Sequence, residues 1–449
     1  MNITLENIDD LNALLKIEVS KSDYEENVEK TLREYRRKAN IKGFRPGMVP
    51  MGLIRKMYGN SAKLDEINKL VSENITGYLK DQNIKILGDP IPADDGNDTS
   101  DFETREDFTF TFEVGLTPEF QIELSKKNKV PFYEITIDDK LRNDYINNYT
   151  RRHGQYKNVE TSGESDVLVG NLEPADDGTN PESGKFSAGN VSIALSVIGD
   201  YEIKKEFTGK KSGDSVIFDI RKAFPNLSEI AGLMKIKKEQ AAKAEGNYKF
   251  TISEISRFEP AEIGKELFDK IYGEDVIKTE EEFRTKIDEE IAVNLANESN
   301  YKLSLDLKQL AIDKTDFELP EKFLKKWLLK VNEKTTEEQI EKEFDSFIKD
   351  LKWQLIRKKI ASENDIKITE EELLREAENL TRYQFNQYGL FYATDEQVTS
   401  YARDLLKNED DARRIADRIL EDKAIEKIKD MVSIENKTIS VDEFNKLFE

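Results

Sequence analysis

An aromatic ring and an arginine, Phe44 and Arg45, have the clearest binding chemistry near the N-terminus, in the segment KANIKGFRPGMVPMGLIRKMYG. The segment is punctuated by turn-forming residues, namely Gly43, Pro46, Gly47 and Pro50. Because glycine and proline interrupt regular structure, we expect a turn with the ring and the guanidinium at its tip. A side chain at the tip of a turn has little core to enter. The pattern therefore indicates a surface that contacts another molecule, by apolar contact and by cation–anion pairing.

Basic residues concentrate around this turn. Residues 21–60 hold ten lysines and arginines against five acids, a charge of +5, whereas the whole chain carries −22 and the remainder therefore −27. The basic neighbours of the turn include Arg36, Arg37 and Lys42. One basic end on an otherwise acidic chain predicts docking on a polyanion by that end only.

The sequence excludes several kinds of catalytic site. It contains no cysteine, which excludes thiol catalysis, disulfides and thiolate metal sites. His153 is the only histidine, so neither a His-pair zinc site nor a Ser-His-Asp triad can be assembled. A Walker-type phosphate-binding loop is absent, which agrees with independence from ATP. We expect no cofactor and no metal, and we assign no catalytic residue.

Composition and length limit the possible domain organisation and the cellular location of the protein. The chain has 449 residues, 37% of them apolar and 36% charged, which favours several domains and a high ratio of surface to core. The first residues, MNITLENIDD, lack the basic start and the apolar centre of a signal peptide. No apolar run approaches the ~20 residues of a membrane span. We therefore expect a cytoplasmic protein that does not enter a membrane.

The elements that must position the turn form a small α+β unit over residues 1–115. LNALLKIEVS has the alternation of a strand, and SKSDYEENVEKTLREYRRKA has the pattern of a helix. A second helix is expected over residues 61–80, after the turn. DFTFTFEVGL closes the unit as a half-buried strand, because Phe108, Phe110 and Phe112 alternate with polar residues.

The rest of the chain divides into three further segments. Residues 116–152 form an extended connector with a short helix, and residues 153–258 are rich in strands separated by Gly, Asp, Asn and Pro. From residue 259 to residue 449 the pattern is helical. Five capping boxes are expected there, at Thr279, Thr336, Thr369, Thr394 and Ser440. Recurrent helix starts predict several separate helices joined by short turns.

This order of domains, together with GFRPGMVP, resembles the bacterial trigger factor family of ribosome-associated chaperones. The family carries a GFRxGKxP-like signature in its ribosome-binding domain, which Gly43, Phe44, Arg45, Gly47 and Pro50 match. Pro46 and Met48 stand where the family usually has lysines. The resemblance covers essentially the whole chain. It implies an ATP-independent chaperone that docks on the large ribosomal subunit near the exit tunnel, and an elongated α+β multidomain fold.

The resemblance also implies that residues 153–258 are an FKBP-like domain of the prolyl-isomerase type. In DYEIKKEFTGKKSGD the end of the family's pocket pattern is kept, at Gly209, Lys211, Gly213 and Asp214. Charged residues replace the Ile-Pro-Gly-Phe run at its front, and Gly170-Asn171 stands where an aromatic–acid pair is expected. We therefore expect weak or lost peptidyl-prolyl isomerase activity. An active isomerase that acts in protein folding is the alternative.

The family uses its helical C-terminal domain, with arm-like projections, as a cradle for nascent and unfolded chains. Such a surface needs accessible apolar area dispersed among charges. The aromatic candidates for contact with clients are Phe344, Phe347, Trp353, Tyr383, Phe385, Tyr388 and Phe391. Packing between helices is the other interpretation of each residue taken singly. The run RYQFNQYGLFYAT is the densest, and Gly389 interrupts it.

Three other functions compete with this one. A stand-alone prolyl isomerase would need a better pocket pattern, and an RNA-binding regulator would bind free RNA as well as ribosomes. The aromatic strands typical of RNA readers are not evident in the sequence. A periplasmic chaperone would share the cradle but need a secretion signal. The expected partners are the ribosome, unfolded polypeptides and a second copy of the chain away from the ribosome.

Overall fold

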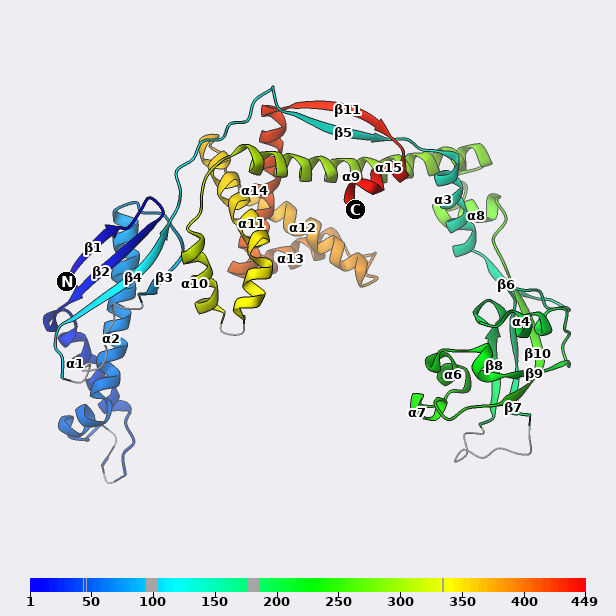
Figure 1. Cartoon of the computed structure of the whole chain (residues 1–449), viewed down its shortest axis with the longest axis horizontal. Helices are drawn as coiled ribbons and strands as arrows, with labels where there is room; N and C mark the ends of the chain where they lie inside the picture. Colours follow the sequence, from blue (N-terminus) through cyan, green and yellow to red (C-terminus); the bar gives the residue numbers. More distant parts are fainter. Residues whose placement is uncertain (43, 46, 94–103, 176–185, 333–334) are drawn as a thin grey trace. The chain divides into compact units, whose positions relative to one another are not determined.

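The computed structural model describes residues 1–42, 44–45, 47–93, 104–175, 186–332 and 335–449. The chain divides into two compact units, and Figure 1 labels their helices and strands. The first unit consists of Met1–Phe132 and Asn300–Asn436, and the second of Tyr133–Ser299 and Lys437–Glu449. Each unit is assembled from two stretches that are distant in sequence. The boundaries expected at residues 115, 152 and 258 stay predictions.

The N-terminal part of the first unit, which we call the head, is an antiparallel sheet with two helices. Its strands are β1 (Asn2–Asn7), β2 (Asn12–Val19), β3 (Ile86–Pro92) and β4 (Phe108–Leu116), paired in the order β1-β2-β4-β3. Its helices are α1 (Lys21–Lys38) and α2 (Met51–Asp81). The two helices pack against each other beside the sheet (Figure 1).

Alternation of apolar and polar residues explains the head sheet. Leu15 and Ile17 of β2 are fully buried and pair with Phe112 and Phe110 of β4, which confirms the strand predicted from FTFTF. Helix α2 begins directly after Pro50 and not at residue 61. Proline lacks a backbone N–H and has a fixed φ, and both properties suit the first residues of a helix.

The remainder of the first unit is helical, and we call it the body. It contains α9 (Glu280–Lys314) from Asn300 onward, α10 (Glu321–Val331), α11 (Glu337–Glu363), α12 (Glu370–Gln387), α13 (Asp395–Leu405) and α14 (Glu409–Met431). Strands β5 (Lys129–Ile135) and β11 (Ser433–Ile439) pair as a separate two-stranded sheet. All five predicted capping boxes form, at Thr279, Thr336, Thr369, Thr394 and Ser440.

Helix α10 joins the head to the body. Trp327 packs on Gly88 of β3, where an added Cβ atom would come within 2.8 Å of the indole ring. Phe323 packs on Gly115 of β4, where the same atom would lie 2.5 Å from the ring. The φ of Gly88 is +72°, a conformation that favours glycine. Because Gly88 and Gly115 have no Cβ atom, the two rings of α10 can pack directly on the backbone of the head sheet.

The second unit contains a five-stranded sheet with short helices between its strands. The strands are β6 (Gln155–Asn158), β7 (Val167–Pro174), β8 (Ala188–Ala194), β9 (Ser215–Asp219) and β10 (Asn247–Glu259). Their order is β6-β10-β7-β8, and β9 also pairs with β10. The helices are α4 (Tyr201–Phe207), α5 (Ile220–Ala223), α6 (Leu227–Met234) and α7 (Lys238–Ala241). A separate core of this unit draws on α3 (Asp139–Arg152), α8 (Lys265–Tyr272), α9 and α15 (Val441–Asn445).

These elements confirm the expected fold class, a mixed α/β multidomain protein with a helical C-terminal region. Helices dominate from α8 onward, as the sequence pattern predicted for the C-terminal region. Among the helices that the structure describes, none combines the length and the apolar character that crossing a bilayer requires.

Candidate functional site

The turn predicted around Phe44 lies between α1 and α2 and is closed by local hydrogen bonds. The backbone N–H groups of Phe44 and Met48 each donate to the carbonyl three residues earlier, at 3.0 and 2.9 Å. Gly47 has a φ of +81°, in the left-handed region that favours glycine. We call residues 41–49 the tip.

The side chains of the tip divide between a small core and solvent. Val49 is fully buried in a cluster with Leu32 and Ile54, which anchors the C-terminal end of the tip. Phe44 is 40% exposed, and Arg45 beside it is exposed as well. The structure thus exposes the apolar ring and the guanidinium of two consecutive residues, as the residue types predicted.

The other members of the predicted basic set flank the tip. Arg36 and Arg37 lie in the last turn of α1, where cations also interact favourably with the helix dipole. Arg36 is partly buried, whereas Arg37 and Lys42 are exposed. The remaining two predicted residues, Gly43 and Pro46, lie outside the described residues. These cations, together with the exposed ring of Phe44, could bind a partner surface that carries negative charge or both negative charge and apolar area.

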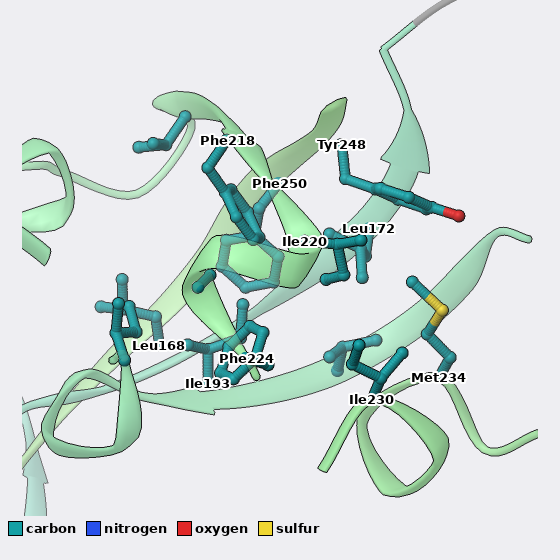
Figure 2. Close-up of a cluster of buried hydrophobic side chains, with 14 of the residues drawn as sticks. Leu168, Leu172, Ile193, Phe218, Ile220, Phe224, Ile230, Met234, Tyr248 and Phe250 are labelled. Atoms are coloured by element: carbon teal, nitrogen blue, oxygen red, sulfur yellow. The ribbon is translucent and has the colours of Figure 1, made fainter. Parts of the chain in front are cut away.

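The five-stranded sheet of the second unit, in the segment expected to be FKBP-like, has a dense apolar core. Figure 2 shows Phe218, Phe224 and Phe250 directed toward one another, with Leu172 and Tyr248 beside them. The ring centroids of Phe218 and Phe224 are 6.3 Å apart, in an edge-to-face arrangement. All five side chains are buried. These aromatic side chains therefore form part of the buried core of this region.

The missing aromatic–acid pair has a physical reason in the sheet. An added Cβ atom at Gly170 of β7 would lie 2.2 Å from the carbonyl oxygen of Thr251 and 2.8 Å from the ring of Phe250. The register of β7 with β8 shifts just after this position, between Gly170 and Leu172. Because β10 approaches so closely, the backbone at Gly170 leaves no room for a side chain that could line a pocket.

The predicted client-binding residues fall into two groups. Phe344 and Trp353 of α11 are buried, and Phe347 packs against the same core of the body. The interpretation as packing residues therefore fits these three, of which Phe344 and Trp353 are buried and Phe347 is partly buried. Tyr383 is exposed on α12, while Phe385 is half-buried in an edge contact with Tyr401.

The exposed group extends into the loop between α12 and α13, which pack as a hairpin (Figure 1). Tyr388 is 81% exposed, Tyr392 is 96% exposed, and Leu390 and Phe391 between them are exposed too. We call residues 388–392 the aromatic loop. Such a density of exposed rings has no packing role within the first unit, and it forms an apolar patch that is available for binding.

Helix-capping chemistry fixes the aromatic loop. Gly389 has a φ of +75° and follows the last turn of α12, and the N–H of Leu390 donates to the carbonyl of Phe385 at 2.8 Å. This is the Schellman arrangement, which ends a helix with a left-handed glycine. An ion pair between Arg382 and Asp395, 2.6 Å long, closes the base of the loop. The rings are thus held outward by a defined backbone.

Electrostatic contacts hold the hairpin on α14. The Nζ of Lys423 lies 2.7 Å from Oε1 of Glu372, at the start of α12. The Lys423 ammonium, followed by the backbone N–H of Thr369, lowers the pKa of Glu372 from its ordinary 4.5 to about 2. A lowered carboxylate pKa stabilises the fold above pH 4.5, and this contribution disappears as the pH falls toward 2. The hairpin contact therefore stays charged at neutral pH.

Known sequence families match the chain in the order of its elements. Residues 1–149 match the family described as "Bacterial trigger factor protein (TF)". Residues 156–260 match "Probable trigger factor, FKBP-like domain", and residues 299–448 match "Probable trigger factor, C-terminal domain". The chain belongs to the trigger factor family. Nearly all of its length is covered by these three matches.

Individual trigger factors are similar to the chain over its full length. The trigger factor of Chlorobaculum parvum is 24% identical over 458 residues, which cover 98% of this chain and 99% of the relative. That of Hahella chejuensis is 25% identical and covers 99% of this chain and 96% of its own. A solved structure reported under "Promiscuous Substrate Recognition in Folding and Assembly Activities of the Trigger Factor Chaperone" is 19% identical, with a TM-score of 0.50 over 95% of this chain and 99% of that chain. This likeness supports the trigger factor fold.

One exposed apolar residue of this trigger factor, Leu390, was not among the candidates for contact with clients, whereas Tyr392 in the same run was an aromatic candidate. Both complete the aromatic loop, and the signal for Leu390 was the run GLFYAT after Tyr388. Met48 was identified only as a departure from the family's lysine. In the structure Met48 is 67% exposed, whereas Phe44 is 40% exposed. The tip is therefore more apolar than the family signature implies.

Proposed function

We propose that this trigger factor is an ATP-independent cytoplasmic chaperone that docks on the large ribosomal subunit through its Gly43–Pro50 loop. The observation that carries the proposal is the exposed pair Phe44 and Arg45 on a tip whose backbone is anchored by Val49. The charge of +5 over residues 21–60, against −27 elsewhere, supports attachment by the head alone.

The body supplies the second half of this function, the shielding of nascent or unfolded chains. The aromatic loop supports it, because exposed rings held on a capped hairpin can contact apolar segments of many sequences. Weak contacts that release quickly suit a client that must still fold. When no ribosome is bound, a second copy of the chain is the proposed occupant of the same exposed apolar surfaces.

Ribosome co-sedimentation tests the docking proposal. Phe44→Ala/Arg45→Ala should lower the amount of protein that pellets with ribosomes about fivefold, because truncation of an interface anchor costs more than ~1 kcal/mol. Tyr201→Ala/Lys205→Ala is the matched control, since it removes an exposed ring and an exposed cation from α4. The control should pellet like wild type. Equal pelleting of wild type and the tip variant would remove the central claim.

We expect the FKBP-like region to be a poor isomerase. The close approach at Gly170 and the mutual packing of Phe218, Phe224 and Phe250 support this expectation. With added protein, a proline-containing peptide should isomerise at close to its uncatalysed rate, over tens to hundreds of seconds. The measurement is a peptide isomerisation assay with an active FKBP-type enzyme as the reference. Rapid turnover that disappears on deletion of residues 153–258 would favour the alternative, an active isomerase.

A further inference from the structure

The six methionines of the chain are unevenly placed. Three of them, Met48, Met51 and Met57, lie within ten residues in the tip and the first turns of α2. Met48 is 67% and Met57 is 50% exposed, whereas Met234 in the FKBP-like core is 4% exposed. Because the chain has no cysteine, methionine sulfur is the sulfur available for reversible oxidation. Met48, the most exposed methionine, therefore lies in the loop that is proposed to dock, and Met57 lies in the helix that follows it.

The backbone of the tip keeps Met48 at the surface. The residue before it, Gly47, has a left-handed φ of +81°, and the residue after it, Val49, is fully buried in the head. The N–H of Met48 donates to the carbonyl of Arg45 at 2.9 Å, which fixes the turn. The side chain cannot retreat into the core without displacing Val49, so its sulfur stays accessible to solutes.

Helix packing does the same for Met57. Ile54 of α2 is fully buried and belongs to the small core beneath the tip. Tyr58 turns toward α1, where its ring makes an edge contact with Tyr35 at 5.6 Å. Met57, one residue before Tyr58, is 50% exposed, and its chain neighbour Lys56 is exposed as well.

We propose that Met48 and Met57 are oxidation sites through which peroxide controls docking. Hydrogen peroxide transfers one oxygen atom to the thioether, so that the sulfur is oxidised by two electrons to the sulfoxide and the peroxide is reduced to water. A dithiol-dependent sulfoxide reductase reverses the step, forming the thioether, a disulfide and water. The proposal rests on the docking function of the tip.

Oxidation changes the chemistry of the tip without changing its charge. The sulfoxide is a polar, strong hydrogen-bond acceptor, so it loses the apolar contact that a methionine side chain can make with a partner surface. Apolar area would be lost at Met48 in the proposed docking loop and at Met57 in the first turns of α2 after it. We expect ribosome affinity to fall about fivefold to tenfold on full oxidation of the two residues.

The experiment compares the full chain before and after a limited treatment with hydrogen peroxide. Peptide mass spectrometry should find sulfoxide at Met48 and Met57 before Met234, and co-sedimentation with ribosomes should fall by the stated factor and recover with sulfoxide reductase. Met48→Leu/Met57→Leu should show the same pelleting with and without peroxide. Met1, which is also exposed, remains oxidisable in that variant and verifies the treatment.

A second variant makes the test independent of the oxidant. Met48→Gln/Met57→Gln introduces polar side chains of similar size and should pellet less than wild type without peroxide. Pelleting of wild type that survives full oxidation of both methionines would overturn the inference, as would sulfoxide that accumulates equally fast at the buried Met234. Untreated wild type that does not pellet would instead overturn the docking proposal itself.

Discussion

Replacing Asp417 and Glu421 by Asn and Gln is expected to lower the free energy of unfolding of the body by about 3–5 kcal/mol. Both carboxylates belong to α14 and face Arg357 of α11, which is only 7% exposed. Arg357 Nη2 lies 2.9 Å from Oδ1 of Asp417, and Nη1 lies 3.5 Å from Oε2 of Glu421. The double amide change would leave a buried guanidinium without a counter-charge.

The same geometry predicts an asymmetry between the partners. Asp417 and Glu421 are partly exposed, so water can solvate them if the guanidinium is removed. Arg357→Met should therefore cost only about 1 kcal/mol, because an apolar side chain replaces a buried charge. Adding Arg357→Met to the double amide variant should restore most of the lost stability, since no unpaired charge remains.

Urea unfolding followed by tryptophan fluorescence measures this effect selectively. The chain has two tryptophans, Trp327 and Trp353, and both lie in the body. Keeping an amide at residue 421 preserves an acceptor for the indole N–H of Trp353, which donates to Glu421 at 3.2 Å. A triple variant no more stable than the double variant would show that the buried charge is not the cause.

Helix starts that carry a capping box were predictable because each box depends on contacts within four residues. The boxes at Thr336 and Thr369 need only a hydroxyl and a partner three positions later, so the sequence contains everything that forms them. The strand of β4 was equally local, since the alternation around Phe110 defines its buried face. The turn at Phe44 followed from the conformational limits of glycine and proline.

Contacts between segments that are distant in sequence could not be predicted from the sequence pattern. Trp327 and Gly88 are far apart in the chain, and neither residue carries a signal that it packs on the other. Trp353 and Tyr388 are both aromatic residues of helical segments, yet one is buried and the other exposed. Helical spacing identifies the apolar face of a helix, but it does not show whether a neighbouring helix covers that face. Only the three-dimensional structure distinguishes the aromatic residues that pack in the core from those that are exposed to clients.

Tyr388→Ser/Phe391→Ser/Tyr392→Ser is expected to weaken binding of unfolded chains by about a hundredfold. Each ring can cover apolar surface of a client, and after the cost of ordering each contact contributes about 1 kcal/mol. The three losses together amount to about 3 kcal/mol, and every 1.4 kcal/mol corresponds to a tenfold change in affinity. The fold should be unaffected, because the rings are exposed and the capping glycine, Gly389, is retained.

Fluorescence anisotropy of a labelled unfolded protein measures this affinity, and suppression of its aggregation gives a second readout. Val197→Ser/Tyr201→Ser/Tyr301→Ser is the matched control, because it removes three exposed apolar side chains elsewhere on the chain. It should bind clients like wild type. If both triple variants lose affinity equally, binding depends on total exposed apolar area and not on the aromatic loop. If neither loses affinity, the client surface lies on other residues of the body.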